Sequence, residues 1–192
     1  MDRVEEKRLL QRAQQGDADS FAQLYRENVQ PIFRYIYHRV NDVQLAEDIT
    51  SAVFTRALQA LHSYTDQGKP FIAWLYRIAH ARVVDHYRRV GRRPVESDVE
   101  AEPIPVAQDM DERLLRRQAA AVLRETIAQL TDDQQHVIIL RFIEGYNLED
   151  TAAMMGKNAN AIKALQHRAL RSLARRLAQS GFDSESILSG LS

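Results

Sequence analysis

EGYNLEDTAAMMGKNANAIKALQHRALRSLARR, residues 144–176, is the stretch of sequence that decides the fold class. Its pattern predicts a short helix over Leu148–Met155 that ends at Gly156, followed by a longer helix over Ala159–Ala178 that Asn158 caps. Apolar residues recur every three or four positions in the longer helix and predict one buried face. These residues are Ile162, Leu165, Ala169, Leu173 and Leu177. A short helix, a glycine turn and a longer helix together are typical of a helix-turn-helix unit.

The opposite face of the longer helix is basic. From Lys157 to Arg176 there are six lysine and arginine residues and no acidic residue. Asparagine and lysine near the start of such a helix can hydrogen-bond base edges in the major groove, whereas arginines further along suit phosphates. An ordinary solvated basic face is the competing interpretation. We predict DNA contacts from Asn158, Asn160, Lys163, His167, Arg168 and Arg171.

The composition excludes several classes of protein. Cysteine is absent, so the chain has neither disulfides nor thiolate metal sites. No apolar run approaches the roughly 20 residues of a membrane span, and the N-terminus has no signal-peptide core. We therefore expect a cytoplasmic protein that does not insert into membranes and needs no cofactor and no metal.

The formal net charge of zero hides an uneven distribution. Residues 1–93 carry +4, residues 94–112 carry −7 and residues 113–192 carry +3. The acidic, proline-containing stretch 91–110 has no apolar periodicity and is expected to be an extended linker. We predict an all-α protein with an N-terminal helical bundle over 1–90, a C-terminal helix-turn-helix domain over 111–178, and a tail over 179–192.

Helical periodicity also locates the remaining elements. Asp19 or Ser20 is expected to cap the second helix, Pro31 to kink or break it, and Pro70 to be the first residue of the fourth. A loop is expected between the third and fourth helices. The expected helices, besides the two above, cover Glu5–Gln15, the residues after Ser20, the residues after Asp42, Phe71–Arg89, Met110–Leu130 and Asp132–Glu144.

Aromatic and basic residues are interleaved over residues 62–93. Rings that stack bases beside positive charge are typical of proteins that bind single-stranded nucleic acid. The loop 63–69 could supply a small polar pocket for a flipped base. The competing interpretation is stronger for Trp74, because it shares helical spacing with Phe71, Leu75 and Ile78 and so is expected in the core.

Three segments resemble one known family. FIAWLYRIAHARVVDHYRR, residues 71–89, resembles the segment of extracytoplasmic-function (ECF) sigma factors, in the sigma-70 family, that melts and reads the promoter −10 element. LAEDITSAVFTRAL, residues 45–58, resembles the helix that docks on the clamp helices of the RNA polymerase β′ subunit. Residues 130–173 resemble the domain that reads the −35 element. The fold that the resemblance implies is a region 2-like bundle joined by the acidic linker to a region 4-like domain.

The resemblance also implies roles for residues. The polymerase-docking residues would be Glu47, Asp48, Phe54 and Arg56. The −10 strand would be held by Tyr64, Lys69, Arg77, His80, Arg82, His86, Arg88 and Arg89. The implied partners are core RNA polymerase, through the β′ clamp helices and the β subunit, promoter DNA, and an anti-sigma factor. The acidic linker would pass through a basic channel of the polymerase.

The chain departs from the family pattern at three places. Ser51-Ala52 stands where many relatives have Gln-Glu, Asn158 replaces the usual capping serine, and Leu165 replaces a basic residue. We therefore infer no particular promoter sequence.

Two other functions compete with a sigma factor that directs promoter-specific initiation. A free-standing helix-turn-helix transcriptional regulator would share the C-terminal unit but would have no use for the aromatic and basic stretch. An enzyme could use His80, Asp85 and His86, yet no HExxH pattern, acidic cluster or glycine-rich phosphate loop accompanies them. We predict that the protein is not an enzyme.

Overall fold

The computed structural model describes residues 1–91 and 110–179, and every regular element in these ranges is helical. The all-α prediction is confirmed. The predicted linker lies outside the described residues, except for its end residues Gly91 and Met110. The predicted tail lies outside them beyond Gln179. The first four helices are α1 (Arg3–Gln14), α2 (Ala18–Val40), α3 (Val43–Ala60) and α4 (Phe71–Val90). The C-terminal helices are α5 (Met110–Ala128), α6 (Asp132–Ile138), α7 (Leu148–Met155) and α8 (Ala159–Gln179).

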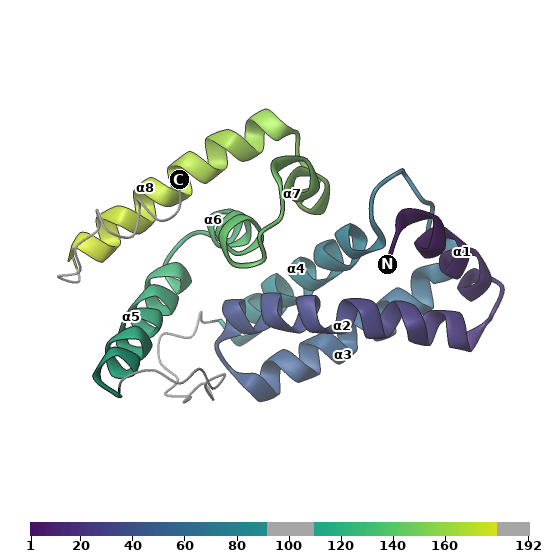
Figure 1. The fold of residues 1–192 in the computed structure, drawn as a ribbon, viewed down its shortest axis with the longest axis horizontal. Helices are drawn as coiled ribbons and strands as arrows, with labels where there is room; N and C mark the ends of the chain where they lie inside the picture. The colour runs from purple at the N-terminus through teal and green to yellow at the C-terminus, as the bar shows by residue number, and fades with distance from the viewer. Residues whose placement is uncertain (92–109, 180–192) are drawn as a thin grey trace.

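Two details of the second helix, its cap and the alternative of a break at Pro31, differ from the prediction. Asp17, not Asp19 or Ser20, caps α2, because its carboxylate accepts the backbone N–H groups of Asp19 and Ser20. Pro31 does not break α2, which is one helix of 23 residues (Figure 1). Proline removes one backbone hydrogen bond, but side chains on both sides of it, Leu24 and Ile32 among them, are fully buried, and this burial outweighs the loss.

The other differences concern helix ends in the second half of the chain and around Pro70. Pro70 is the cap residue before α4 rather than its first residue. The helix expected over Asp132–Glu144 is split, since α6 ends at Ile138 and a π-helical turn, η2 (Ile139–Ile143), follows it. The wider turn precedes Gly145, whose φ of 74° directs the chain toward α7.

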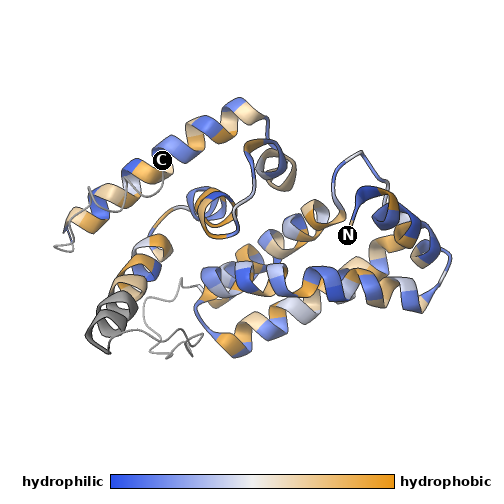
Figure 2. Ribbon diagram, viewed as in Figure 1, coloured by the Kyte–Doolittle hydropathy of each residue, from blue (hydrophilic) through white to orange (hydrophobic). Residues whose placement is uncertain are grey.

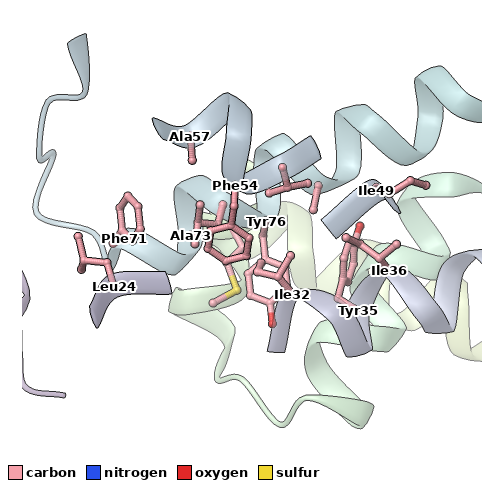
Figure 3. Close-up of a cluster of buried hydrophobic side chains, with 14 of the residues drawn as sticks. Leu24, Ile32, Tyr35, Ile36, Ile49, Phe54, Ala57, Phe71, Ala73 and Tyr76 are labelled. Carbon is pink, nitrogen blue, oxygen red and sulfur yellow. The ribbon is translucent and has the colours of Figure 1, made fainter. Parts of the chain in front are cut away.

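Figure 2 shows that hydrophobic and hydrophilic residues are interspersed along the coloured parts of the helices, as expected of amphipathic helices. The apolar faces of α1–α4 form one large core. Leu24, Ile32, Tyr35, Phe71 and Tyr76 lie at its centre and are fully buried (Figure 3). A second core joins α5, α6, α7 and α8 through Ile127, Leu130, Val137 and the predicted stripe of α8.

The two parts of the chain are in contact. Ile139, Leu140, Ala153 and Met154 belong to the N-terminal core rather than to the C-terminal one. Figure 1 shows α6 and α7 between α8 and the N-terminal bundle, with α7 packed on α4. The face of α8 that points away from α6 and α7 is therefore left on the outside of the molecule.

Helix α1 braces the start of α4 and the loop before it. Proline has no side chain that can cap a helix, and here the Glu6 carboxylate of α1 accepts the N–H of Phe71 instead. Glu6 is buried and is also paired with Arg3 at 2.8 Å. A negative charge at a helix N-terminus is favourable, so this contact fixes where α4 begins.

Within residues 1–91 and 110–179, none of the helices combines the length and the hydrophobicity that a membrane span requires.

Candidate nucleic-acid and polymerase interfaces

Helices α7 and α8 form the predicted helix-turn-helix. Gly156 joins them at φ 63°, a left-handed conformation that costs other L-residues about 1–2 kcal/mol. Asn147 caps α7 by accepting the Asp150 N–H at 2.8 Å. Asn158 caps α8 as predicted, with its Oδ1 accepting the Ala161 N–H at 2.8 Å. Local sequence therefore fixes both helix starts and the turn between them.

The two faces of α8 are cleanly separated. All five residues of the predicted stripe are buried, whereas the six predicted −35 residues are all exposed. The sides of α8 are held by polar contacts to other helices, with Gln166 accepting from Arg141 Nε at 3.1 Å and Ser172 bonded to Gln134 at 3.3 Å. The cationic face is thus presented by a helix whose orientation is fixed.

Asn158, one of the residues predicted to contact bases, already makes a side-chain hydrogen bond within the protein. A bidentate contact to adenine needs both the amide oxygen and the amide nitrogen of asparagine. Asn158 Oδ1 already accepts the Ala161 N–H, which ties the orientation of its side-chain amide to the cap of α8. Asn160, two residues further on and exposed, makes no such capping contact in the described structure and has both groups available.

A groove lies between α2 and α3, which we call the α2–α3 groove. It has a volume of about 520 Å³ and is open to solvent. Phe54 is 4% exposed at its base and packs edge-on against Tyr25, with ring centroids 4.7 Å apart. Glu47 lines the groove, and so does Leu58, which is 54% exposed. The other lining residues are Phe21, Val29, Gln30, Phe33, Thr50, Ser51 and Thr55.

The predicted polymerase-docking residues do not all belong to this groove. Glu47 and Phe54 line it, and Asp48 is exposed on α3 without lining it. Arg56 lies on another side of α3, where it lines a pocket with Arg77 and Arg82 of α4. The structure thus places Arg56 beside the predicted −10 residues.

The loop between α3 and α4 encloses a smaller pocket of about 300 Å³, which we call the loop pocket. Tyr64, Lys69, Trp74 and Arg77 line it, with Ala60, Ser63, Thr65, Gln67, Pro70 and Ala73. The Tyr64 and Trp74 ring centroids are 4.7 Å apart. Burial raises the pKa of Tyr64 to about 12, so its phenol stays neutral. Trp74 is only half-buried and forms a wall of the pocket, although its helical spacing favoured the core.

Contacts from α1 hold this loop in place. Gln14 Nε2 donates to the carbonyls of Leu61 at 3.0 Å and Tyr64 at 2.7 Å. Asp66 accepts the Gly68 N–H at 2.8 Å and is paired with Arg3 at 3.2 Å and Lys7 at 3.4 Å. The loop is therefore built before any ligand arrives.

Beside the loop pocket, a pocket of about 500 Å³ runs along α4, which we call the α4 pocket. Arg56, Trp74, Arg77 and Arg82 line it with Ile78, Ala81 and Asp85. Arg88 follows Arg77 by about three helical turns, so it returns to the same face, and Arg89 follows Arg82 by about two. Both are exposed. The predicted −10 arginines therefore share one side of α4.

The two predicted −10 histidines lie elsewhere. His80 points toward the C-terminal part of the chain, where its ring stacks on His136 with centroids 4.5 Å apart. His86 is half-buried beside Tyr87. Asp85 lines the α4 pocket, so the three residues that an enzyme could have used are on different sides of the helix. Among the described residues, no three histidine, aspartate or glutamate side chains are grouped so as to hold a metal ion.

Comparisons with known proteins match two separate parts of this chain. The model of "Sigma-70 region 2" matches residues 24–93, and that of "Sigma-70, region 4" matches residues 126–175. The first match contains the loop pocket, the α4 pocket and the whole lining of the α2–α3 groove except Phe21. The second contains α7, the turn and most of α8.

Relatives of known family are similar over most of this chain. BldN, an ECF RNA polymerase sigma factor of Streptomyces coelicolor, is 40% identical over 170 residues, covering 88% of this chain and 64% of BldN. ShbA, an ECF sigma factor of Streptomyces griseus, is 33% identical over 175 residues, covering 86% of this chain and 91% of ShbA. This chain thus spans less than two thirds of BldN but most of ShbA.

A solved structure has the same fold. The sigma factor RpoE from Bartonella quintana, in complex with the anti-sigma factor NepR, matches with a TM-score of 0.65 at 21% identity. The match covers 84% of this chain and 98% of RpoE. With two family regions in order and a relative 33% identical over nearly its whole length, the chain belongs to the ECF sigma factors of the sigma-70 family, which act in transcription initiation.

Proposed function

We propose that this chain binds core RNA polymerase in the cytoplasm and directs it to promoters by reading a −10 and a −35 element. The observation that carries the proposal is the pairing of a cationic, outward-facing α8 with an aromatic and cationic pocket beside α4 in one chain. A free-standing regulator is not favoured, because it has no use for region 2. No reaction is part of the proposal, since sigma factors regulate transcription without being enzymes.

Helix α8 is proposed to read the −35 duplex from the major groove. Asn160, Lys163 and His167 lie on the exposed face within its first three turns, where base edges are within reach. Asn158 would add one donor through Nδ2 while its Oδ1 caps the helix. Arg168 and Arg171 would contact phosphates and so fix the position of α8.

The loop pocket and the α4 pocket are proposed to hold the melted −10 strand. The loop pocket is of a size that suits one unstacked base, and Trp74 and Tyr64 provide aromatic surface for stacking. Lys69 and Arg77 would neutralise the neighbouring phosphates. Because Arg56 lines the α4 pocket, we assign it to this strand and not to the polymerase. His80 is part of an internal contact, so in its present position it would not face DNA.

The α2–α3 groove is proposed to receive the β′ clamp helices of the polymerase. Its apolar floor at Phe54 and Tyr25 suits the apolar ridge of a helix, and Glu47 and Asp48 add negative charge beside it. The β subunit is the proposed neighbour of region 4. We also propose an anti-sigma factor as a partner, of the kind that RpoE binds in its solved complex.

The test is transcription in vitro with purified bacterial core polymerase and a library of templates with randomised promoter sequences. We expect transcripts whose start sites share two upstream elements. A library without any promoter-dependent transcript would refute the proposal. Tight, specific binding to duplex DNA by the chain alone would instead favour a free-standing regulator.

A matched pair of variants tests the docking groove. Leu58→Gln removes an exposed apolar side chain that lines the groove, and should weaken binding to core polymerase. Val43→Gln changes a comparably exposed side chain on α3 that does not line it, and should leave binding unchanged. Equal effects of the two would show that the groove is misassigned.

A further inference from the structure

The contact between the two parts of the chain is a built interface. Arg34 of α2 pairs with Glu144 through both oxygens, at 3.2 and 2.7 Å. Tyr76 of α4 is bonded through its hydroxyl to that of Tyr146 at 3.3 Å. Arg39, whose side chain is fully buried, pairs with Asp132 at 2.9 Å. Polar contacts thus surround the apolar residues that α7 and η2 contribute to the N-terminal core.

At the centre of this interface two histidines stack face to face. The rings of His80 on α4 and His136 on α6 are 4.5 Å apart and inclined by 16°. His136 is 2% exposed, and within the described structure its Nε2 has no hydrogen-bond partner. His80 Nδ1 is 3.3 Å from Arg39 Nη1. A guanidinium can only donate, so Nδ1 of His80 must be the acceptor, and the ring is neutral with its single proton on Nε2.

The charged groups around the pair leave no spare negative charge for an imidazolium. From α2 the pair faces Arg39, and Tyr35, whose pKa burial raises to about 12. From α6 it faces Asp132 and Asp133, and from the turn before α8 it faces Lys157. Asp132 is paired with Arg39, and Asp133 with Lys157 at 3.2 Å.

Burial is accordingly the largest cause of the lowered pKa of both histidine rings. It lowers the pKa of His80 to about 4, with the Arg39 charge acting in the same direction. It lowers the pKa of His136 well below its ordinary value, and the neighbouring His80 lowers it further. In the closed arrangement both rings are therefore neutral at pH 7.

We propose that the stacked His80–His136 pair makes the contact between the N-terminal bundle and the helix-turn-helix domain a pH-sensitive contact, closed at neutral pH and opened by mild acid. Once the two parts separate, each ring regains water and an ordinary pKa near 6.5. The open state then binds more protons than the closed state at every pH between about 6.5 and about 4. The equilibrium shifts toward opening as the pH falls through that window, by roughly tenfold per histidine between pH 7.5 and 5.5.

Opening matters for the proposed function, and this consequence rests on it. Elements at −10 and −35 are about 25 base pairs apart, which is roughly 85 Å along B-DNA. In the closed arrangement α7 packs against α4, so the distance between the two proposed reading surfaces is fixed and cannot adjust to the spacing of the two elements. The 18 residues between 91 and 110 could span at most about 60 Å. Together with the widths of the two domains, that length allows the separated parts to reach both elements.

The test measures the separation of the two parts in the free, full-length chain, so it does not depend on transcription. Because the chain has no cysteine, Gln59→Cys at the end of α3 and Ala178→Cys at the end of α8 allow specific labelling with a fluorophore pair. Energy transfer is followed from pH 7.5 to 5.5, with helicity recorded by circular dichroism at each pH.

We expect energy transfer to fall with pH while helicity is kept. In a His80→Asn, His136→Phe background, which keeps an acceptor and a stacked ring but cannot titrate, transfer should stay high. His62→Asn, at an exposed histidine outside the interface, should behave like the parent. In the parent, protonation of the two rings followed by NMR should share its midpoint with opening. Unchanged transfer in the parent, an equal fall in the double variant, or loss of helicity at the same pH would overturn the proposal.

Discussion

Helices α8 and α4 both present positive charge to solvent, yet they are built differently. Helix α8 has two faces, an inner one of leucine, isoleucine and alanine and an outer one of polar and basic residues. Helix α4 has three, because Phe71, Leu75 and Val83 lie in the core, Trp74 and Arg77 line pockets, and His80 contacts the other part of the chain. A substitution on α8 should therefore affect either folding stability or DNA recognition, whereas a substitution on α4 should affect both.

The largest expected effect is on the inner face of α8. Leu173→Ala removes a side chain that is 2% exposed, and should lower the free energy of unfolding of the C-terminal part by about 2–5 kcal/mol. Arg171→Ala, two residues away on the outer face, should change it by less than about 0.5 kcal/mol. Urea unfolding followed by circular dichroism measures both. Similar losses for the two variants would contradict the separation of faces.

The second largest effect is expected for Trp74→Ala, which tests whether one residue of α4 serves both stability and recognition. It should cost about 1–3 kcal/mol in open-complex formation through lost base stacking. It should also destabilise the N-terminal bundle, because Trp74 packs against Tyr64 and Phe71. Trp74→Phe keeps a stacking surface and should recover most of both. Permanganate footprinting of the −10 region and urea unfolding measure the two effects, and a purely structural loss would remove Trp74 from the proposed base pocket.

Lys163→Ala should affect recognition alone. Loss of a base or phosphate contact should cost about 1–3 kcal/mol at the −35 element. Binding to core polymerase and the free energy of unfolding should not change, since Lys163 is exposed and outside both cores. Arg8→Ala, an exposed cation on α1, serves as the charge control. Titrations of holoenzyme on promoters with intact and scrambled −35 elements measure the loss of affinity. An equal loss of affinity on both templates would count against base reading by Lys163.

The smallest effect is expected at Asn158, which caps α8 and is also predicted to contact the −35 element. Asn158→Ala removes the cap of α8 and should lower stability by about 1 kcal/mol, whereas Asn158→Ser should be nearly neutral. If capping is its main task, the serine variant should keep the −35 preference of the parent. A changed preference in the serine variant, measured by selection from a randomised −35 library, would show that Asn158 reads a base directly.

The extent of successful prediction differs between the same two regions. For α7 and α8 the helix starts, the glycine turn and the buried stripe were all predictable, because caps, φ > 0 glycine and apolar spacing act over a few residues. The family assignment was predictable too, since its motifs are contiguous. The assignment of individual side chains to DNA or polymerase stays a prediction.

What the sequence could not supply lies in contacts between distant residues. His80 and His136 are 56 positions apart and Arg34 and Glu144 are 110 apart, so no local pattern indicates that they meet. The position of Arg56 is a second example, because a helix turns by about 100° per residue and directs Arg56 toward α4, away from Glu47 and Phe54 in the α2–α3 groove. Pro31 does not break α2, because side chains on either side of it are buried, and local propensity does not include that burial.

The brace formed by α1 has a consequence for how such a factor can change over evolution. Residues 3–14 precede the segment that matches region 2, which begins at residue 24, yet Arg3, Glu6 and Gln14 fix the loop inside that segment. A mutation in α1 can therefore alter the shape of the loop without touching any side chain proposed to contact the strand. Under the proposed function, promoter opening can thus be adjusted through α1 without any change in the residues proposed to contact the −10 strand.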